Sequence, residues 1–264
     1  MKIALTIAGS DSGGGAGIQA DLKTFHQFGV FGTSAIVALT AQNTRGVRAI
    51  HPVPADFVEA QLDALAEDLP PAALKTGMLA EAALVRQVAG AIARHHWAPL
   101  VVDPVMVASS GDQLLAPDAA AAVRQSLLPL ARLVTPNLDE AEILTGREVR
   151  TPAQMETAGR QLLEFGPAAV LVKGGHLDGE TVTDVLISAE GIRRFTRPRL
   201  ATRAGHGTGC TLSAAVTAGL ALGRSLETAV IDALEFVHRA LATAPDIGGG
   251  TGPLNHSAPA PPAG

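Results

Sequence analysis

The sequence predicts an α/β fold in which a mainly parallel, doubly wound sheet lies between two layers of helices. Short apolar runs alternate with longer stretches of helical spacing along most of the 264 residues, and this alternation is typical of a parallel sheet covered on both faces. Polar or glycine residues follow several apolar runs, at the position where ligands bind in such sheets. These residues are 9–11, Asp103, Asn137 and 173–175.

The predicted strands are short apolar runs. Residues 3–8 form the first run, which ends at Gly9 and is read as a buried strand. A continuous apolar run of this kind is typical of a strand covered on both faces. Further strands are predicted at residues 33–39, 73–76, 100–102, 133–135 and 169–172.

Amphipathic helices are predicted between the strands. Val58, Leu62 and Leu65 recur at helical spacing, which places them on one face of a helix. Pro70 and Pro71 end that helix, because proline interrupts helical hydrogen bonding. The other helices are predicted at residues 18–28, 84–92, 155–165, 209–222 and 226–244.

A single domain is predicted for residues 1–256, because neither a repeat nor a shift in composition marks a boundary. Residues 181–203 are interpreted as a ribbon of edge strands. The irregular stretch at residues 188–203 disfavours a TIM barrel, in which strand–helix units recur more evenly. Residues 257–264 are rich in proline and alanine and are predicted to be disordered.

Composition and charge exclude several classes of protein. Hydrophobic residues make up 47% of the chain, enough for a large core, and the formal net charge is −5 without a basic run. Aromatic residues make up 3% and tyrosine is absent, so nucleic acid is not expected as a partner. We recognise neither a membrane helix nor a signal peptide. With a single cysteine, the protein is expected to be soluble and cytoplasmic.

The most informative motif, GHGTGCT, spans residues 205–211 and opens onto a predicted helix of small residues. Its glycines permit tight turns, and the amides at a helix start attract anions. A helix start also favours a thiolate, so the motif predicts a lowered pKa for Cys210 and a role as a base. The alternative is that Cys210 is a small buried residue beside a simple turn.

A second glycine-rich loop, residues 9–17, follows the first strand. It lacks the lysine of a P-loop, and no acidic residue ends a second strand as in a dinucleotide-binding fold. Asp21 lies in the next helix and is expected to point back toward this loop, where it would bind a polar ligand edge. The alternatives are a flexible loop and an aspartate that only compensates the helix dipole.

Charged and amide side chains follow three other predicted strands. Asn137 and Glu140 are interpreted either as a capping box at a helix start or as residues that organise a hydrated Mg²⁺. Asp103 would add negative charge beside that ion. Lys173 is either the counter-charge to a phosphate or a surface lysine beside a turn.

The remaining polar residues narrow the chemistry. The amide of Gln42 offers a donor and an acceptor to the edge of a pyrimidine or pyridine ring, whereas Asn43 is read as a turn residue. His51, His95 and His96 lack metal-ligand spacing with cysteine. No nucleophile-elbow motif supports a Ser-His-Asp triad. The sequence therefore favours ring binding over a histidine metal centre or a serine hydrolase.

Together these stretches resemble the ribokinase-like superfamily and, within it, the hydroxymethylpyrimidine/phosphomethylpyrimidine kinases of thiamine biosynthesis. The resemblance runs from Leu5 to about Leu222. It is specific to this subfamily, because sugar kinases of the superfamily usually carry an aspartate where Cys210 stands. The matching signatures are residues 6–11 (TIAGSD), 14–23 (GGAGIQADLK), 41–44 (AQNT), 75–79 (KTGML), 103–106 (DPVM), 135–137 (TPN), 173–176 (KGGH) and 206–211 (HGTGCT).

The resemblance implies a three-layer α/β/α fold of the ribokinase-like type, usually found as a homodimer, that uses ATP and Mg²⁺. It also implies a pocket for a pyrimidine ring. The residues that would line this pocket are Gly9, Ala16, Asp21, Gln42 and Met78.

The resemblance further implies where the chemistry takes place. Cys210 would accept the proton of the substrate hydroxyl, and the amides around Gly207 and Gly209 would form an anion hole. Lys173 would bind the transferring phosphoryl group. The residues that would organise Mg²⁺ and the ATP phosphates are Asp103, Asn137 and Glu140, with Thr208 beside them.

The implied activity is phosphoryl transfer from ATP to hydroxymethylpyrimidine and then to its monophosphate. Pyridoxal kinase of the same subfamily is an alternative, because Gln42 and Met78 do not exclude a pyridine ring. A non-catalytic binding protein for a vitamin precursor is another, although Lys173 and Cys210 argue against it. A thiol enzyme with Cys210 as nucleophile would require His206 as its partner.

Overall fold

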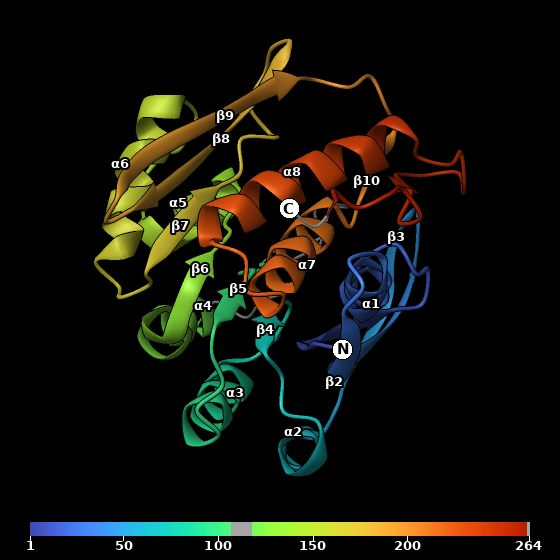
Figure 1. Cartoon of the computed structure of the whole chain (residues 1–264), viewed down its shortest axis with the longest axis vertical. Helices are drawn as coiled ribbons and strands as arrows, with labels where there is room; N and C mark the ends of the chain where they lie inside the picture. Colours follow the sequence, from blue (N-terminus) through green and yellow to red (C-terminus); the bar gives the residue numbers. More distant parts are fainter. Residues whose placement is uncertain (107–117, 263–264) are drawn as a thin grey trace.

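One large sheet forms the centre of the molecule (Figure 1). The computed structural model describes residues 1–106 and 118–262, and within these residues the sheet has nine strands. The strands are β1 (Ile3–Asp11), β2 (Phe31–Asn43), β3 (Gly46–Pro52), β4 (Ala73–Thr76), β5 (Leu100–Val102), β6 (Ala131–Val134), β7 (Ala169–Val172), β8 (Thr181–Ser188) and β9 (Gly191–Pro198). Their order is β3-β2-β1-β4-β5-β6-β7-β8-β9.

The six central strands, from β2 across to β7, run parallel, whereas β3 pairs antiparallel with β2, β8 with β7, and β9 with β8. A separate parallel pair joins β10 (Ala204–His206) to β11 (Gly252–Pro253). The helices are α1 (Gly17–Gln27), α2 (Ala55–Asp68), α3 (Ala82–Arg94), α4 (Ala119–Ala122), α5 (Leu138–Thr145), α6 (Pro152–Leu163), α7 (Thr208–Ala221) and α8 (Leu226–Ala242).

Two hydrophobic cores cover the two faces of the sheet. Leu100 and Val102 point into one core with side chains from α2, α3, α5 and α6, whereas Val101 points into the other with side chains from α1, α7 and α8. Successive residues of a strand point to opposite faces, so β1, β4, β5, β6 and β7 each supply side chains to both cores. The predicted three-layer, doubly wound α/β/α fold is confirmed.

Most predicted elements are present. Strands β4, β5 and β7 have the predicted bounds, and residues 181–203 contain the edge ribbon of β8 and β9. The sheet is open, which excludes the TIM barrel. Strand β3 was not predicted, because much of it is exposed and carries no apolar pattern. Among the described residues, no helix has the length and hydrophobicity needed to cross a bilayer.

The start of the predicted disordered tail is packed. Ala258 is 3% exposed and joins the core beneath α7 and α8, and Arg239 donates a hydrogen bond to the carbonyl of Pro259. These contacts offset the flexibility expected from a proline- and alanine-rich composition. Residues 263–264 of that tail lie outside the described residues.

Chain topology creates a crevice at one end of the sheet. Strand β1 lies between β2, which follows it through α1, and β4, which is reached after α2 on the opposite face. The chain therefore leaves β1 and β4 toward opposite faces, and ligands of open α/β sheets bind at such a switch point. Residues from the carboxyl ends of both strands meet here, since a Cβ atom added to Gly9 would lie 2.6 Å from Cε of Met78.

Candidate active site

Asp11 organises the glycine-rich loop that follows β1. Its carboxylate accepts hydrogen bonds from the amides of Gly13 (2.7 Å), Gly15 (3.0 Å) and Ala16 (2.9 Å), and His206 Nε2 lies 2.8 Å from Oδ2. Burial alone would raise the pKa of Asp11, but the bonds from His206 and the amides lower it overall. The loop is thereby fixed around a buried charge, which contradicts the flexible-loop alternative.

The start of α7 is pressed against this loop. Gly207 is the N-cap of α7 with φ of 84°, a left-handed conformation that favours glycine. A Cβ atom at Gly207 would lie 1.9 Å from the carbonyl oxygen of Gly15, so a side chain cannot be accommodated. The two glycine-rich segments, distant in sequence, therefore form one surface at the helix start, where free amides attract anions.

A lysine lies directly beside this helix start. A Cβ atom added to Gly209 would lie 3.1 Å from Nζ of Lys173, and Nζ lies 3.0 Å from Oδ1 of Asp103 and 3.7 Å from Oε2 of Glu140. Lys173 has 14% of its side chain exposed, so it is not the surface lysine of the alternative reading. Burial would lower the pKa of Lys173, but the two carboxylates raise it overall, so the ammonium stays charged.

Asp103 is the most enclosed member of this cluster, with 1% of its surface exposed. Its Oδ1 accepts a hydrogen bond from Thr135 (3.2 Å), and its Oδ2 accepts one from Ser213 of α7 (3.2 Å). Burial opposes the charge, but the ammonium of Lys173 and a second buried lysine, Lys75, lower the pKa of Asp103 overall. Asp103 thus links the end of β5 to α7 and remains ionised.

Asn137 and Glu140 form the predicted capping box at the start of α5. The Glu140 amide donates to Asn137 Oδ1 at 2.8 Å, and the Asn137 amide donates to Glu140 Oε2 at 2.7 Å. Burial raises the pKa of Glu140 to about 7, even though Lys173 opposes the shift. The structural and functional readings are therefore compatible, because the cap holds a carboxylate beside Lys173.

The predicted lowering of the Cys210 pKa is wrong. Burial raises the pKa of the thiol to about 12, and the attraction of Lys75 offsets only part of that shift. The helix start cannot compensate, because Asp21 and Asp103 add negative charge to the same low-dielectric surroundings. His206 is hydrogen-bonded to Asp11 instead, so the thiol-nucleophile alternative has no partnered histidine.

Asp21 does not face the glycine-rich loop as expected. Its Oδ1 lies 2.9 Å from Nζ of Lys75, and its Oδ2 accepts a hydrogen bond from Thr6 at 2.6 Å. Asp21 and Lys75 have fully buried side chains. The carboxylate turns inward because Lys75, at the end of β4, supplies the opposite charge that a buried carboxylate requires. Its placement does not support a direct contact with the substrate ring.

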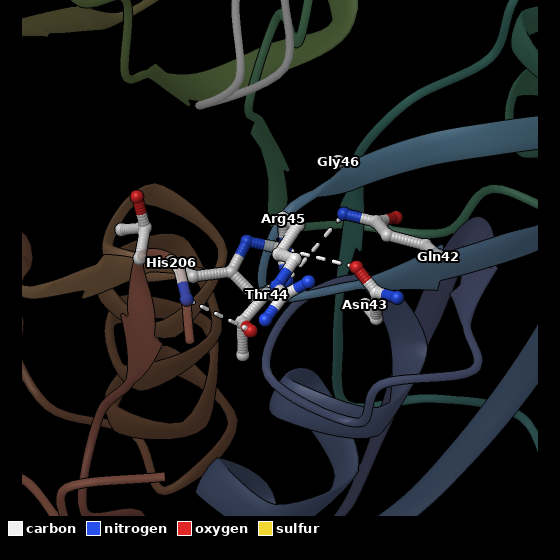
Figure 2. A pocket seen from close by; sticks show the side chains of 8 residues that line it. Gln42, Asn43, Thr44, Arg45, Gly46 and His206 are labelled. Carbon is white, nitrogen blue, oxygen red and sulfur yellow. Dashed lines mark hydrogen bonds between the residues drawn. The ribbon is translucent and has the colours of Figure 1, made fainter. Parts of the chain in front are cut away.

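A cavity of about 290 Å³ lies beside Gln42 and His206 (Figure 2). The Gln42 amide is 3.5 Å from His206 Nε2, and its oxygen accepts a bond from Thr40 at 3.2 Å. Of the predicted ring-binding residues, Gln42 lines this cavity. Gly9 and Met78 meet at the switch point, and Ala16 stands in the loop bound by Asp11.

Some of the residues predicted to bind Mg²⁺ and the nucleotide phosphates make local hydrogen bonds instead, whereas others remain suitable for binding. Thr208 turns its hydroxyl to the carbonyl of Gly205 at 2.8 Å and so stabilises the turn. Asn137 uses its side-chain oxygen in the cap. The described residues hold no group of three His, Cys, Asp or Glu side chains that could bind a metal. Asp103 and Glu140 nevertheless fit Mg²⁺, which keeps several waters and needs only one or two carboxylates.

The sequence assigned no role to Asp11 or Lys75, and it considered His206 only as a partner of Cys210. A charged residue inside the apolar run of β4 could have indicated Lys75, since lysine is almost never fully buried unless it is paired. The bonds of Asp11 and His206 could not be predicted, because 195 residues separate them.

Fold and site together define a small-molecule kinase. A helix start that attracts anions, a charged lysine and two buried carboxylates meet at the carboxyl end of a doubly wound sheet, and phosphoryl transfer depends mainly on such positioning and charge neutralisation. The chain belongs to the phosphomethylpyrimidine kinase family, whose family model matches residues 11–255.

Individual relatives agree with this family. The hydroxymethylpyrimidine/phosphomethylpyrimidine kinase of Rhizobium meliloti (strain 1021) is 51% identical over 257 residues, which cover 96% of each chain. An ADP complex of Bacillus subtilis pyridoxal kinase has a TM-score of 0.92 and 38% identity, with 98% of both chains covered. Phosphomethylpyrimidine kinase of Clostridium difficile 630 has a TM-score of 0.81 and 41% identity, covering 91% of this chain and 99% of that one.

Proposed function

We propose that this kinase transfers the γ-phosphoryl group of ATP to the hydroxymethyl group of 4-amino-5-hydroxymethyl-2-methylpyrimidine, and then phosphorylates the monophosphate to the diphosphate. The observation that carries the proposal is the position of the Lys173 ammonium at the start of α7, 3.1 Å from where a Cβ atom on Gly209 would stand. That position supports a site for a transferring phosphoryl group. The family match supports the choice of acceptor.

Charge neutralisation is the main task of the site. The amides at the start of α7 bind the oxygens of the γ-phosphoryl group, and Lys173 balances the charge that these oxygens carry in the loose transition state. Mg²⁺, when bound, supplies further neutralisation of the nucleotide phosphates. Asp103 and Glu140 would hold it through water, while Lys173 keeps the two carboxylates apart.

The two transfers differ in their need for a base. In the first, the substrate oxygen bonds to the γ-phosphorus, the bond to the ADP oxygen breaks, and the hydroxyl proton moves to the thiolate of Cys210. In the second, the acceptor is an ionised phosphate that already has a nucleophilic oxygen. The same site therefore performs both transfers, and Cys210 acts as base only in the first.

Turnover with ATP and Mg²⁺ tests the proposal. The purified protein is supplied separately with hydroxymethylpyrimidine, its monophosphate and pyridoxal, and products are separated by chromatography. Conversion of the pyrimidine through to its diphosphate is the expected result. Tight binding of the pyrimidine without ATP turnover would instead indicate a non-catalytic binding protein and would contradict the proposal.

Pyridoxal kinase activity is a second candidate function. The structural similarity to the Bacillus subtilis pyridoxal kinase favours it, and pyridoxal also carries a hydroxymethyl group on a flat ring. In the same assay, efficient turnover of pyridoxal alone would identify the protein as a pyridoxal kinase. Turnover of both rings would assign both activities to this site.

Replacing Cys210 with alanine is expected to lower the rate of the first transfer by about 10²- to 10⁴-fold. The rate of the second transfer should fall far less. The pH dependence should differ in the same way. With a thiol pKa of about 12, the thiolate fraction grows about tenfold per pH unit between about pH 7 and pH 9, so the first transfer accelerates and the second does not. Initial rates with each acceptor measure this. Equal losses in both transfers, or equal pH slopes, would contradict the role of Cys210.

Replacing Glu140 with glutamine tests the role of its carboxylate separately from its role in the capping box. Glutamine can keep the capping box, so the fold is retained, but the Mg²⁺ concentration for half-maximal activity is expected to rise about tenfold. The folded-state pKa of Glu140 is about 7 against 4.5 for an ordinary glutamate. Ionisation therefore costs stability as pH rises from about 4.5 to about 7.

Without Mg²⁺ and nucleotide, the Glu140→Gln protein should therefore melt at a higher temperature than the parent above about pH 7. Below about pH 4.5 the two proteins should melt at the same temperature. Melting curves at both ends of the window measure the difference. A variant that loses stability equally at both ends would show that glutamine does not maintain the cap.

We further propose a cytoplasmic homodimer. Edge strand β3 is an open pairing surface, and its residues Arg48, Ala49, Ile50 and His51 are exposed. An uncovered edge strand readily pairs with another chain. The molar mass in solution, measured by light scattering, tests the dimer.

A further inference from the structure

The segment after α8 contacts residues 42–46, here called the Gln42 turn, which comprise the end of β2, the turn that follows it and the first residue of β3. The Thr251 amide donates to the carbonyl of Thr44 at 2.9 Å, and the Gly250 amide donates to the Thr44 hydroxyl at 3.3 Å. The two backbones touch, since a Cβ atom added to Gly250 would lie 2.0 Å from the Thr44 carbonyl oxygen. Residues 248–256, here called the C-terminal clamp, therefore pack against the turn between β2 and β3 and are hydrogen-bonded to it.

The same clamp reaches the start of α7. Within it, β11 pairs with β10, which leads directly into the anion-binding turn. Pro253 lies against Gly15, whose added Cβ would stand 3.1 Å from the proline Cβ. His256 Nε2 lies 3.0 Å from the hydroxyl of Thr211, the residue after Cys210. Thr211 is fully buried and His256 is 8% exposed, so water does not readily replace this bond.

The clamp is itself anchored in the core. Leu254 is 2% exposed and packs in the core beneath α7 and α8, and the Asn255 amide donates to the carbonyl of Ala240 at 3.0 Å. A segment held at this depth transmits displacement at one end to the other, because packed interiors are stiff. Figure 1 shows the chain after α8 beside β10, near β3.

The clamp also forms one wall of the cavity beside Gln42. Gly250 and Thr251 line it together with residues 42–46, and His206 lines it next to the start of α7. Figure 2 shows Gln42, which is expected to bind the acceptor, on the same cavity as His206, the residue before the N-cap of α7.

We propose that the C-terminal clamp completes the acceptor side of the active site: it holds the Gln42 turn in register with the start of α7, and His256 is a positioning residue for that helix start. This inference rests on the proposed kinase function. Burial lowers the pKa of His256 to about 4, so the imidazole is neutral at physiological pH and its bond to Thr211 does not depend on protonation in that range.

Substitution of Gly250 with alanine tests the end of the clamp at the Gln42 turn. The added methyl group meets the Thr44 carbonyl and displaces the turn, so the KM for the acceptor should rise about tenfold while the KM for ATP stays within about twofold. Gly90→Ala is the matched control, because a methyl group there meets nothing within 4 Å. An unchanged acceptor KM, or equal rises in both KM values, would overturn the proposal.

Substitution of His256 tests the other end. His256→Ala leaves the Thr211 hydroxyl without its partner, and kcat should fall about tenfold for both transfers. His256→Gln places an amide where the imidazole nitrogen stood and should restore most of that loss. Assays are run well below the melting temperature of each variant. Loss of kcat that glutamine fails to rescue, or a fall in melting temperature with kcat unchanged, would overturn the positioning role.

Hydrogen exchange tests the proposed role of the clamp independently of the proposed kinase function, because the measurement requires no turnover. In the ligand-free Gly250→Ala protein, amide exchange should accelerate both in the turn at residues 42–46 and at the start of α7. Faster exchange in the turn alone would overturn the clamp. Absence of turnover in the parent protein with every acceptor would count against the proposed function and leave this readout intact.

Discussion

Replacing Lys173 with methionine is expected to lower kcat for both transfers by about 10²- to 10³-fold, which is typical of removing one preorganised charge from a transition state. Lys173 lies between Asp103 and Glu140 and faces Gly209 at the anion-binding turn. Without its ammonium, the γ-phosphoryl group would meet two carboxylates directly. The KM for the acceptor should change little, because the ring binds elsewhere.

The Lys173→Met protein should remain folded. Asp103 keeps its bonds from Thr135 and Ser213, and Glu140, with a pKa of about 7, can take up a proton when the lysine is removed. Circular dichroism and steady-state kinetics with each acceptor measure the two effects. Lys2→Met is the control, because Lys2 is exposed and remote from the site. A Lys173→Met protein that is folded and retains most of its kcat would refute the assigned role.

Replacing Lys75 with methionine is expected to destabilise the fold by about 3–5 kcal/mol, the cost of leaving one partner of a buried ion pair alone. Lys75 and Asp21 are both fully buried, and their charged atoms lie 2.9 Å apart. After the substitution, Asp21 would keep only its bond from Thr6. Such a loss is a large share of the stability of a typical domain.

The double substitution Lys75→Met with Asp21→Leu shows whether the loss arises from the charge. Because both charges are removed together, most of the lost stability should return. Urea unfolding of the parent, the two single variants and the double variant measures the coupling between the residues. Stability of Lys75→Met within about 1 kcal/mol of the parent would contradict the structural assignment of this pair.

Local sequence patterns predicted much of the fold. Strands β5 and β7 are buried along their whole length, so they appear as uninterrupted apolar runs with clear ends. Strand β3 could not be found in this way. Its hydrogen bonds come from pairing with β2, and its exposed side chains leave no apolar signal.

The site was predictable only in part. Asp103 and Lys173 stand at strand ends, so the sequence could indicate that they face ligands, and the capping box of Asn137 and Glu140 is a local pattern. The thiol pKa of Cys210 was not predictable. It depends on burial and on charges from α1, β4 and the end of β5, none of which is near Cys210 in the chain.

The sequence by itself determined which residues stand at the carboxyl ends of the parallel strands and at the helix starts, because apolar runs, glycines and caps are local features. Only the tertiary structure decided which of those residues meet. Asp21 turns to Lys75, His206 to Asp11 and His256 to Thr211 across long sequence separations. Charge state and orientation in a buried site depend on neighbours that folding brings together, and no local pattern records them.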